Sequence, residues 1–149
     1  MIIDTLKQLF NRDLNKLKLE IESYHNEKRI WHFEKAISNS AGNLCLHLVG
    51  SLNAYIGVGL AKTNYIRNRD LEFSLKDIPR VELVKKIEET MIIVEKGLNN
   101  LHEDQLHADF PIMIWNKATE MEYTLVHFAG HLNYHLGQIN YHRRLLDNQ

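Results

Sequence analysis

Apolar residues recur every three or four positions in four long segments of this chain, which is the spacing of one face of an α-helix. The clearest stripes lie in residues 2–24 and 79–101, where charged residues fill the positions between them. The first stripe contains Ile2, Leu6, Leu9, Phe10, Leu14, Leu17, Ile21 and Tyr24, and the second contains Val81, Val84, Ile87, Met91, Val94, Leu98 and Leu101. The pattern predicts two amphipathic helices, and Pro79 suits the first turn of the second one.

The other two segments, residues 41–63 and 119–146, are almost free of charge. No Asp, Glu, Lys or Arg occurs in residues 36–61 or in residues 123–142. We predict a helix in each segment, with Ser38 or Ser40 as the N-cap of the first and a capping box at residues 119–122 for the second. A helix without a charged face is usually buried on most sides. Because a monomer of four helices cannot readily cover two such helices, a second subunit could cover their remaining faces.

Six of the seven glycines lie in these two charge-free segments. A glycine inside a helix costs about 0.5–1 kcal/mol relative to alanine, which is more tolerable where another backbone approaches closely. We therefore expect close packing at Gly50, Gly57, Gly130 and Gly137, whereas Gly42 and Gly59 could mark frayed ends or exposed turns.

Composition narrows the class of protein. The 149 residues suit one domain, 1–149, and 18 basic against 19 acidic residues give a net charge of −1, which does not suggest a nucleic-acid binder. A single cysteine, Cys45, excludes an internal disulfide and fits a reducing compartment. The first residues lack the pattern of a signal peptide, and polar residues such as Asn43 and Gln138 interrupt the charge-free segments. We expect an all-α, cytoplasmic domain that binds neither nucleic acid nor membrane.

Candidate chemistry is concentrated in the histidines of the charge-free segments. His131 and His135 are four residues apart, so their Cβ atoms lie about 5–6 Å apart on one helical face. One divalent metal could reach both at about 2.0–2.1 Å. His47 lies in the other charge-free segment, where the alternative is a hydrogen-bonded core histidine. If the two helices are neighbours, the three imidazoles converge, and three protein ligands plus water is the usual composition of a catalytic metal site.

Several nearby residues leave alternatives open. The pair is not a zincin motif, because Leu132 stands where that motif has a glutamate base, so deprotonation must depend on the metal or on a residue elsewhere. Gln138 could hydrogen-bond a ligating histidine or be solvated. His127 and His142 could be reserve ligands or partly exposed polar residues. Residues 67–69 (Arg-Asn-Arg) could bind an anionic substrate or form a solvated turn.

Two stretches, residues 43–52 (NLCLHLVGSL) and 131–139 (HLNYHLGQI), resemble the DinB-like family, also called YfiT-like. The helix pattern extends the resemblance over essentially the whole chain. It implies a four-helix bundle in an up-down-down-up arrangement and a homodimer. It also implies a site for zinc, nickel, iron or a similar divalent ion, with ligands that correspond to His47, His131 and His135.

The resemblance leaves the reaction open. Relatives include thiol transferases that use bacillithiol, mycothiol or glutathione, and mycothiol-dependent isomerases, but this sequence looks closest to a branch without an assigned reaction. The first hypothesis is an enzyme in which the metal activates a thiol or water for transfer or hydrolysis on a small molecule. The alternative is a non-catalytic dimeric protein with a metal-binding or stress-related binding role.

Overall fold

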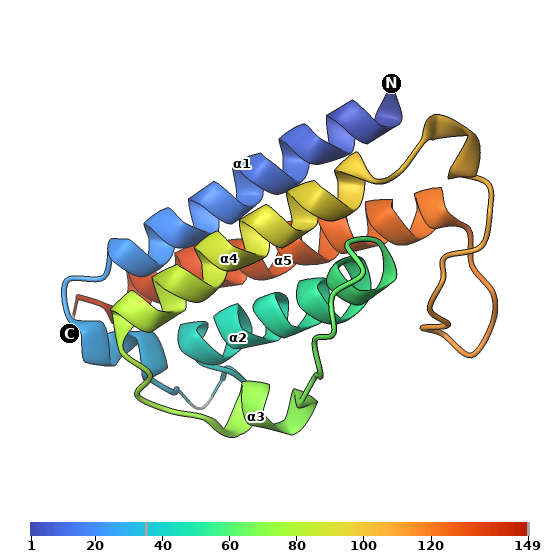
Figure 1. Cartoon of the computed structure of the whole chain (residues 1–149). Helices are drawn as coiled ribbons and strands as arrows, with labels where there is room; N and C mark the ends of the chain where they lie inside the picture. Colours follow the sequence, from blue (N-terminus) through green and yellow to red (C-terminus); the bar gives the residue numbers. More distant parts are fainter. Residues whose placement is uncertain (35, 149) are drawn as a thin grey trace.

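The computed structural model describes residues 1–34 and 36–148; Lys35, in the connector after the first helix, and Gln149 lie outside the described residues. Regular structure in this part is entirely helical, apart from one isolated β-bridge between Asp109 and Glu120. The four predicted helices appear as α1 (Ile2–Glu22), α2 (Ala41–Leu52), α4 (Arg80–Asn99) and α5 (Met121–Leu146), which lie side by side (Figure 1). The predicted all-α class is confirmed.

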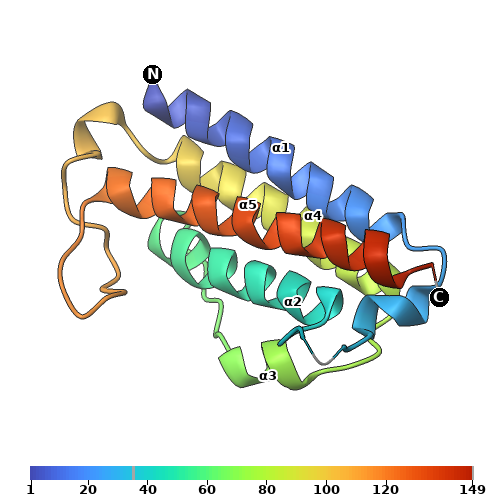
Figure 2. The same cartoon turned by 180° about the vertical axis from the view of Figure 1, so that it is seen from behind.

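The four long helices run in two opposite directions around a common core. The chain runs one way along α1 and α5 and the opposite way along α2 and α4, as both views show (Figures 1 and 2). Helix α1 packs on α4 and α5, and α2 packs on the same two helices from the other side. The predicted stripes supply this core, including Phe10 and Leu14 from α1 and Ile87 and Leu98 from α4. Val81, at the start of the second stripe, is exposed instead.

The observed starts of α2 and α5 test the two predicted capping signals. Ser40 is the N-cap of α2, and its side chain accepts a hydrogen bond from the Asn43 backbone N–H. The predicted capping box before α5 is wrong: Glu120 is the N-cap and makes no side-chain cap bond. The Thr119 carbonyl instead accepts the Phe110 N–H at 2.8 Å. Pairing with the preceding loop therefore fixes the entry to α5.

In the described part of the chain, four shorter helical elements complete the connections. A π-helical turn, η2 (Asn53–Gly57), continues α2, and the short helix α3 (Arg69–Ser74) packs against α2. Turns of 3-10 helix, η1 (Glu27–Trp31) and η3 (Glu103–Gln105), lie in the predicted connectors. Within residues 1–34 and 36–148, the longest apolar stretch of any helix is insufficient to cross a membrane.

The two charge-free helices have different surroundings. All twelve residues of α2 are buried, as we predicted. Helix α5 buries one face but exposes a stripe at steps of three and four residues: Tyr123, Val126, Gly130, Tyr134, Gly137, Tyr141 and Leu145. The single chain therefore covers α2 completely and leaves one face of α5 uncovered.

The same division holds for the glycines. A Cβ built on Gly50 or Gly57 would touch a neighbouring side chain at 3.2 Å or closer, so close packing is correct at these two positions. A Cβ built on Gly130 or Gly137 would find no atom within 4 Å. Close packing at these two positions is therefore not found within the chain.

Candidate metal centre

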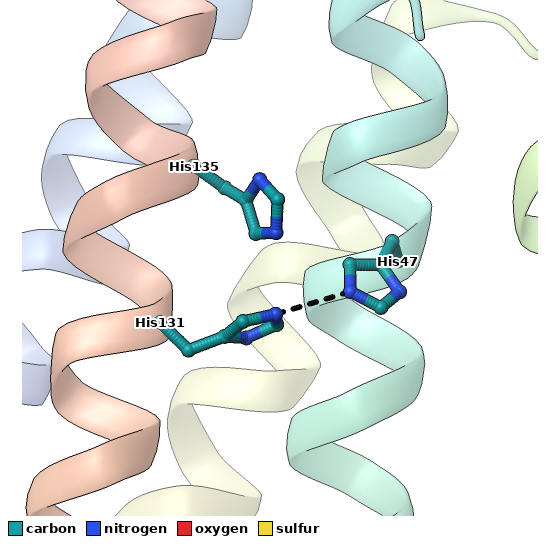
Figure 3. Close-up of side chains that lie close together, drawn as sticks. All are labelled: His47, His131 and His135. Carbon is teal, nitrogen blue, oxygen red and sulfur yellow. Dashed lines mark hydrogen bonds between the residues drawn. The ribbon is translucent and has the colours of Figure 1, made fainter. Parts of the chain in front are cut away.

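The packing of α2 against α5 brings the three predicted histidines together (Figure 3). His47 is buried, while His131 and His135 are partly exposed. The Nε2 atoms of His47 and His131 are 3.1 Å apart, and one ring nitrogen from each of the three residues lies within 4.8 Å of the others. Metal bonds of about 2.0–2.1 Å in tetrahedral geometry separate two ligand nitrogens by about 3.3 Å. Small side-chain rotations would therefore bring all three imidazoles onto one ion.

Two of the three imidazole rings have a hydrogen-bond partner at Nδ1, on the side of the ring that faces away from the other histidines. His135 Nδ1 lies 2.7 Å from Gln138 Oε1, and His47 Nδ1 lies 3.1 Å from Glu72 Oε1. Each oxygen accepts a hydrogen bond from Nδ1–H, so the lone pair of the ring lies on Nε2, where it could bind a metal. Metal-binding histidines usually have such a partner. The residues present therefore fit a divalent ion.

The glutamate that orients His47 is a functional residue that sequence reasoning missed. Glu72 lies on α3, and its carboxylate is buried beside α2. Arg67 donates from Nε to Glu72 Oε2 and from Nη2 to Glu72 Oε1, both at 2.9 Å. Burial alone would raise the pKa of the Glu72 carboxyl, but the hydrogen bonds from His47 and Arg67 and their charges lower it below its usual value. The carboxylate is therefore ionised at neutral pH.

The cluster also keeps His131 and His135 neutral. Burial, followed by the nearby His135 and His47 and then His127 and Arg67, lowers the pKa of His131 to about 4. Burial lowers the pKa of His135 as well, against the opposing hydrogen bond to Gln138. Neutral imidazole is the form that binds metals. Both rings are thus ready to act as ligands near pH 7.

Other predicted candidates lie outside the cluster. The His127 ring is stacked on His131 with centroids 6.2 Å apart, and its centroid lies 4.8 Å from that of Trp115. His142 is buried near the end of α5, where its Nδ1 accepts the Tyr24 hydroxyl at 2.7 Å. Cys45 is buried, which raises the pKa of its thiol to about 12 and keeps it protonated. It is therefore a core residue.

In the Arg-Asn-Arg run Arg67 is partly buried, whereas Asn68 and Arg69 are exposed, and all three have partners within the chain. Arg67 is paired with Glu72, and the Asn68 side chain accepts the Leu71 N–H as the N-cap of α3. The guanidinium carbon of Arg69 lies 5.3 Å from the centre of the Phe73 ring. The run therefore builds the segment that carries Glu72. With only six residues, α3 is too short to show a helical period, so no sequence signal indicated this role.

The chain matches a known protein family over nearly its whole length. The sequence model of a family described as "Protein of unknown function (DUF1572)" matches residues 2–149. That family is a member of the DinB/YfiT-like superfamily, which agrees with the resemblance seen in the two histidine stretches. No curated protein matches the chain. The family match covers the whole helical domain and names no reaction.

Proposed function

This chain belongs to the DUF1572 family, and we propose that its three-histidine cluster is the divalent-metal centre of an enzyme acting on a small molecule. The observation that carries the proposal is the convergence of His47, His131 and His135, with two of the rings oriented by Glu72 and Gln138. Zinc, nickel and iron all suit a site of three imidazoles.

The ligand set favours catalysis over a purely structural metal. Three protein ligands leave a coordination position open, and His131 and His135 are partly exposed, so a small molecule could approach them. A bound divalent ion would lower the pKa of a water or thiol in that position. The oxygens of Glu72 already accept hydrogen bonds from His47 and Arg67, so we assign no general base to this carboxylate.

We also propose an up-down-down-up four-helix bundle that assembles as a homodimer. The directions of α1, α2, α4 and α5 support the bundle. The exposed stripe of α5 supports the dimer, because its tyrosines and Leu145 form an apolar surface of the kind that marks interaction sites. Gly130 and Gly137 within this stripe would let a second helix approach closely.

Metal content of the purified protein tests the centre. We expect about one divalent ion per chain by elemental analysis, reduced to a trace in His135→Ala. The matched control is His107→Ala, because the His107 side chain is 81% exposed and lies outside the cluster. Native protein that holds no ion after incubation with zinc, nickel or iron, or equal metal content in the two variants, would contradict the proposal.

Turnover separates an enzyme from a binding protein. The metal-loaded protein is mixed with an electrophilic substrate and a low-molecular-weight thiol, and separately with activated esters and amides in water. Thiol consumption or hydrolysis that is lost in His135→Ala supports catalysis. Stoichiometric metal without turnover in either assay would favour the non-catalytic metal-binding alternative.

A further inference from the structure

Helix α2 presents a stripe of three residues to α3. Asn43, His47 and Gly50 are separated by four and three positions, so they share one helical face. Asn43 is fully buried, and its Nδ2 donates to the carbonyls of Glu72 and Leu75, both at 2.9 Å. These carbonyls lie in the last turn and at the C-cap of α3. One amide therefore fixes the short helix against α2.

Gly50 makes room for the carboxylate that α3 carries. A Cβ built on Gly50 would overlap Glu72 Oε2 and lie 2.6 Å from Glu72 Cδ, closer than real Cβ atoms approach a neighbour. An alanine at this position would therefore displace the carboxyl group. The glycine lies three residues after His47, on the side of the helix where Glu72 meets that ring.

Arg67 holds the same carboxylate from the other side. Its two hydrogen bonds to Glu72 have the paired geometry that fixes a carboxylate in its plane. The Arg67 guanidinium carbon lies 5.7 Å from the centre of the Tyr55 ring, on the π-helical turn that continues α2. Three contacts, from Asn43, Gly50 and Arg67, thus converge on one residue outside the metal-binding helices.

We infer that α3 is a positioning segment for the metal centre. Glu72 keeps the proton of His47 on Nδ1 and directs Nε2 to the ion. Gly50, which has no side chain, leaves the space that the Glu72 carboxylate occupies. This inference rests on the proposed metal site. Glu72 is a positioning residue and not a ligand, because its oxygens are engaged by His47 and Arg67. Loss of such a partner typically weakens metal binding 10–100-fold.

Zinc affinity across a double-mutant cycle tests the inference. We expect Glu72→Ala to raise the Kd for zinc about 10–100-fold, and Glu72→Gln, which keeps an acceptor oxygen, to raise it less. Gly50→Ala should weaken binding although alanine is the better helix former. Added to Glu72→Ala, the Gly50→Ala change should cost little more, because no carboxylate remains to be displaced. The control is Glu89→Ala, an exposed glutamate on α4, which should leave the Kd unchanged.

The tautomer of His47 provides a readout that needs no metal. In the metal-free protein, nitrogen NMR of the imidazoles should show His47 protonated at Nδ1, and Glu72→Ala should remove that preference while circular dichroism confirms a folded chain. A protein that binds zinc equally well with and without Glu72 would overturn the inference and leave the metal site standing. His47 protonated at Nε2 in the native chain would overturn the inference whether or not zinc binds.

Discussion

Helices α2 and α5 share the same sequence signal, a long run without charge, yet they occupy different environments. Helix α2 has every residue buried, covered by α3, α4 and α5. Helix α5 packs one face on α1 and α2 and leaves a stripe of tyrosines, glycines and Leu145 exposed. Burial within one chain explains why α2 has no charged residue. It does not explain why the exposed stripe of α5 has none, so that absence points to a contact outside the chain.

The difference indicates two separate reasons why a helix can lack charged residues. In α2 an ionised side chain would face the core or α3, where burying a charge is costly. In α5 a charge on the stripe would meet only water in the monomer, so folding of a single chain does not require its absence. A second copy of the chain would require it.

The largest effect is expected from a cavity in α2. Leu48→Ala removes a fully buried side chain and should lower the free energy of unfolding by about 2–5 kcal/mol. Val126→Ala, in the exposed stripe of α5, should change it by less than about 0.5 kcal/mol in the monomer. Urea unfolding at low protein concentration measures both values. Equal losses would show that the exposed stripe is packed like the core.

Metal removal should lower the stability of the fold through both α2 and α5. A divalent ion would join His47 of α2 to His131 and His135 of α5. At a free ion concentration 100 times the Kd, binding stabilises the folded state by about 2.7 kcal/mol. Thermal unfolding with zinc and with a chelator measures the difference, which His131→Ala should abolish. A Tm unaffected by zinc in the native protein would contradict this expectation.

A smaller loss is expected where α5 contacts the connector that follows α1. Tyr24→Phe removes the hydroxyl that donates to His142 Nδ1 and leaves that buried nitrogen without its partner. The expected cost is about 1–3 kcal/mol of unfolding free energy. Tyr65→Phe, at a more exposed tyrosine, is the control. No loss in Tyr24→Phe would mean that water replaces the hydroxyl.

Acid should weaken the same contact. Burial lowers the pKa of His142 in the folded state, where Nδ1 accepts from Tyr24 and Nε2 donates to the His32 carbonyl. Below the unfolded pKa of about 6.5 the unfolded chain binds a proton that the folded chain does not. Stability is therefore complete above about pH 6.5 and declines as the pH falls toward the folded pKa.

Unfolding by urea at pH 7.5 and pH 5.5 measures this decline. One histidine contributes a slope of at most about 1.4 kcal/mol per pH unit. His142→Asn should show a shallower decline than the native chain. The decline should persist in part, because burial also lowers the pKa values of His131 and His135. An unchanged slope in the variant would contradict the assignment to His142.

The smallest effect on folding should accompany the largest effect on assembly. Tyr141→Glu places a charge in the exposed stripe of α5, where Tyr141 is 63% exposed. The unfolding free energy of the monomer should change by less than about 0.5 kcal/mol. Light scattering should nevertheless report a dimer for the native chain and a monomer for the variant. Lys85→Glu on α4 should leave the mass unchanged, and a monomeric native chain would remove the case for the dimer.

Much of the fold could be predicted from the sequence because four helices carry long periodic patterns. The predicted α1 and α4 begin and end within about two residues of the observed bounds. The capping box before α5 was wrong because a backbone pairing between Phe110 and Thr119 decides that helix start. Such a contact depends on how a loop folds back, which no local spacing encodes. The sequence did not say which of the two charge-free helices keeps an uncovered face, because both carry the same charge-free pattern.

The convergence of the three histidines could be predicted, but the residue that supports His47 could not. His131 and His135 are fixed by helical spacing, and His47 follows once the two charge-free helices are neighbours. Glu72 lies 25 residues from His47, in a short helix whose residues show no periodicity. In the sequence, only Gly50 indicated a close contact on the face of α2 that meets Glu72. A glycine does not indicate which residue makes that contact.

The placement of Glu72 on a connecting segment has a consequence for how such a centre could diversify. The three histidines lie on core helices, where substitution threatens the fold, whereas Glu72 lies on the segment that connects α2 to α4. Substitution of Glu72 or Arg67 would change the support of His47 and leave the three histidines in place. Protein engineers who want to alter metal preference could therefore start from single substitutions in this segment.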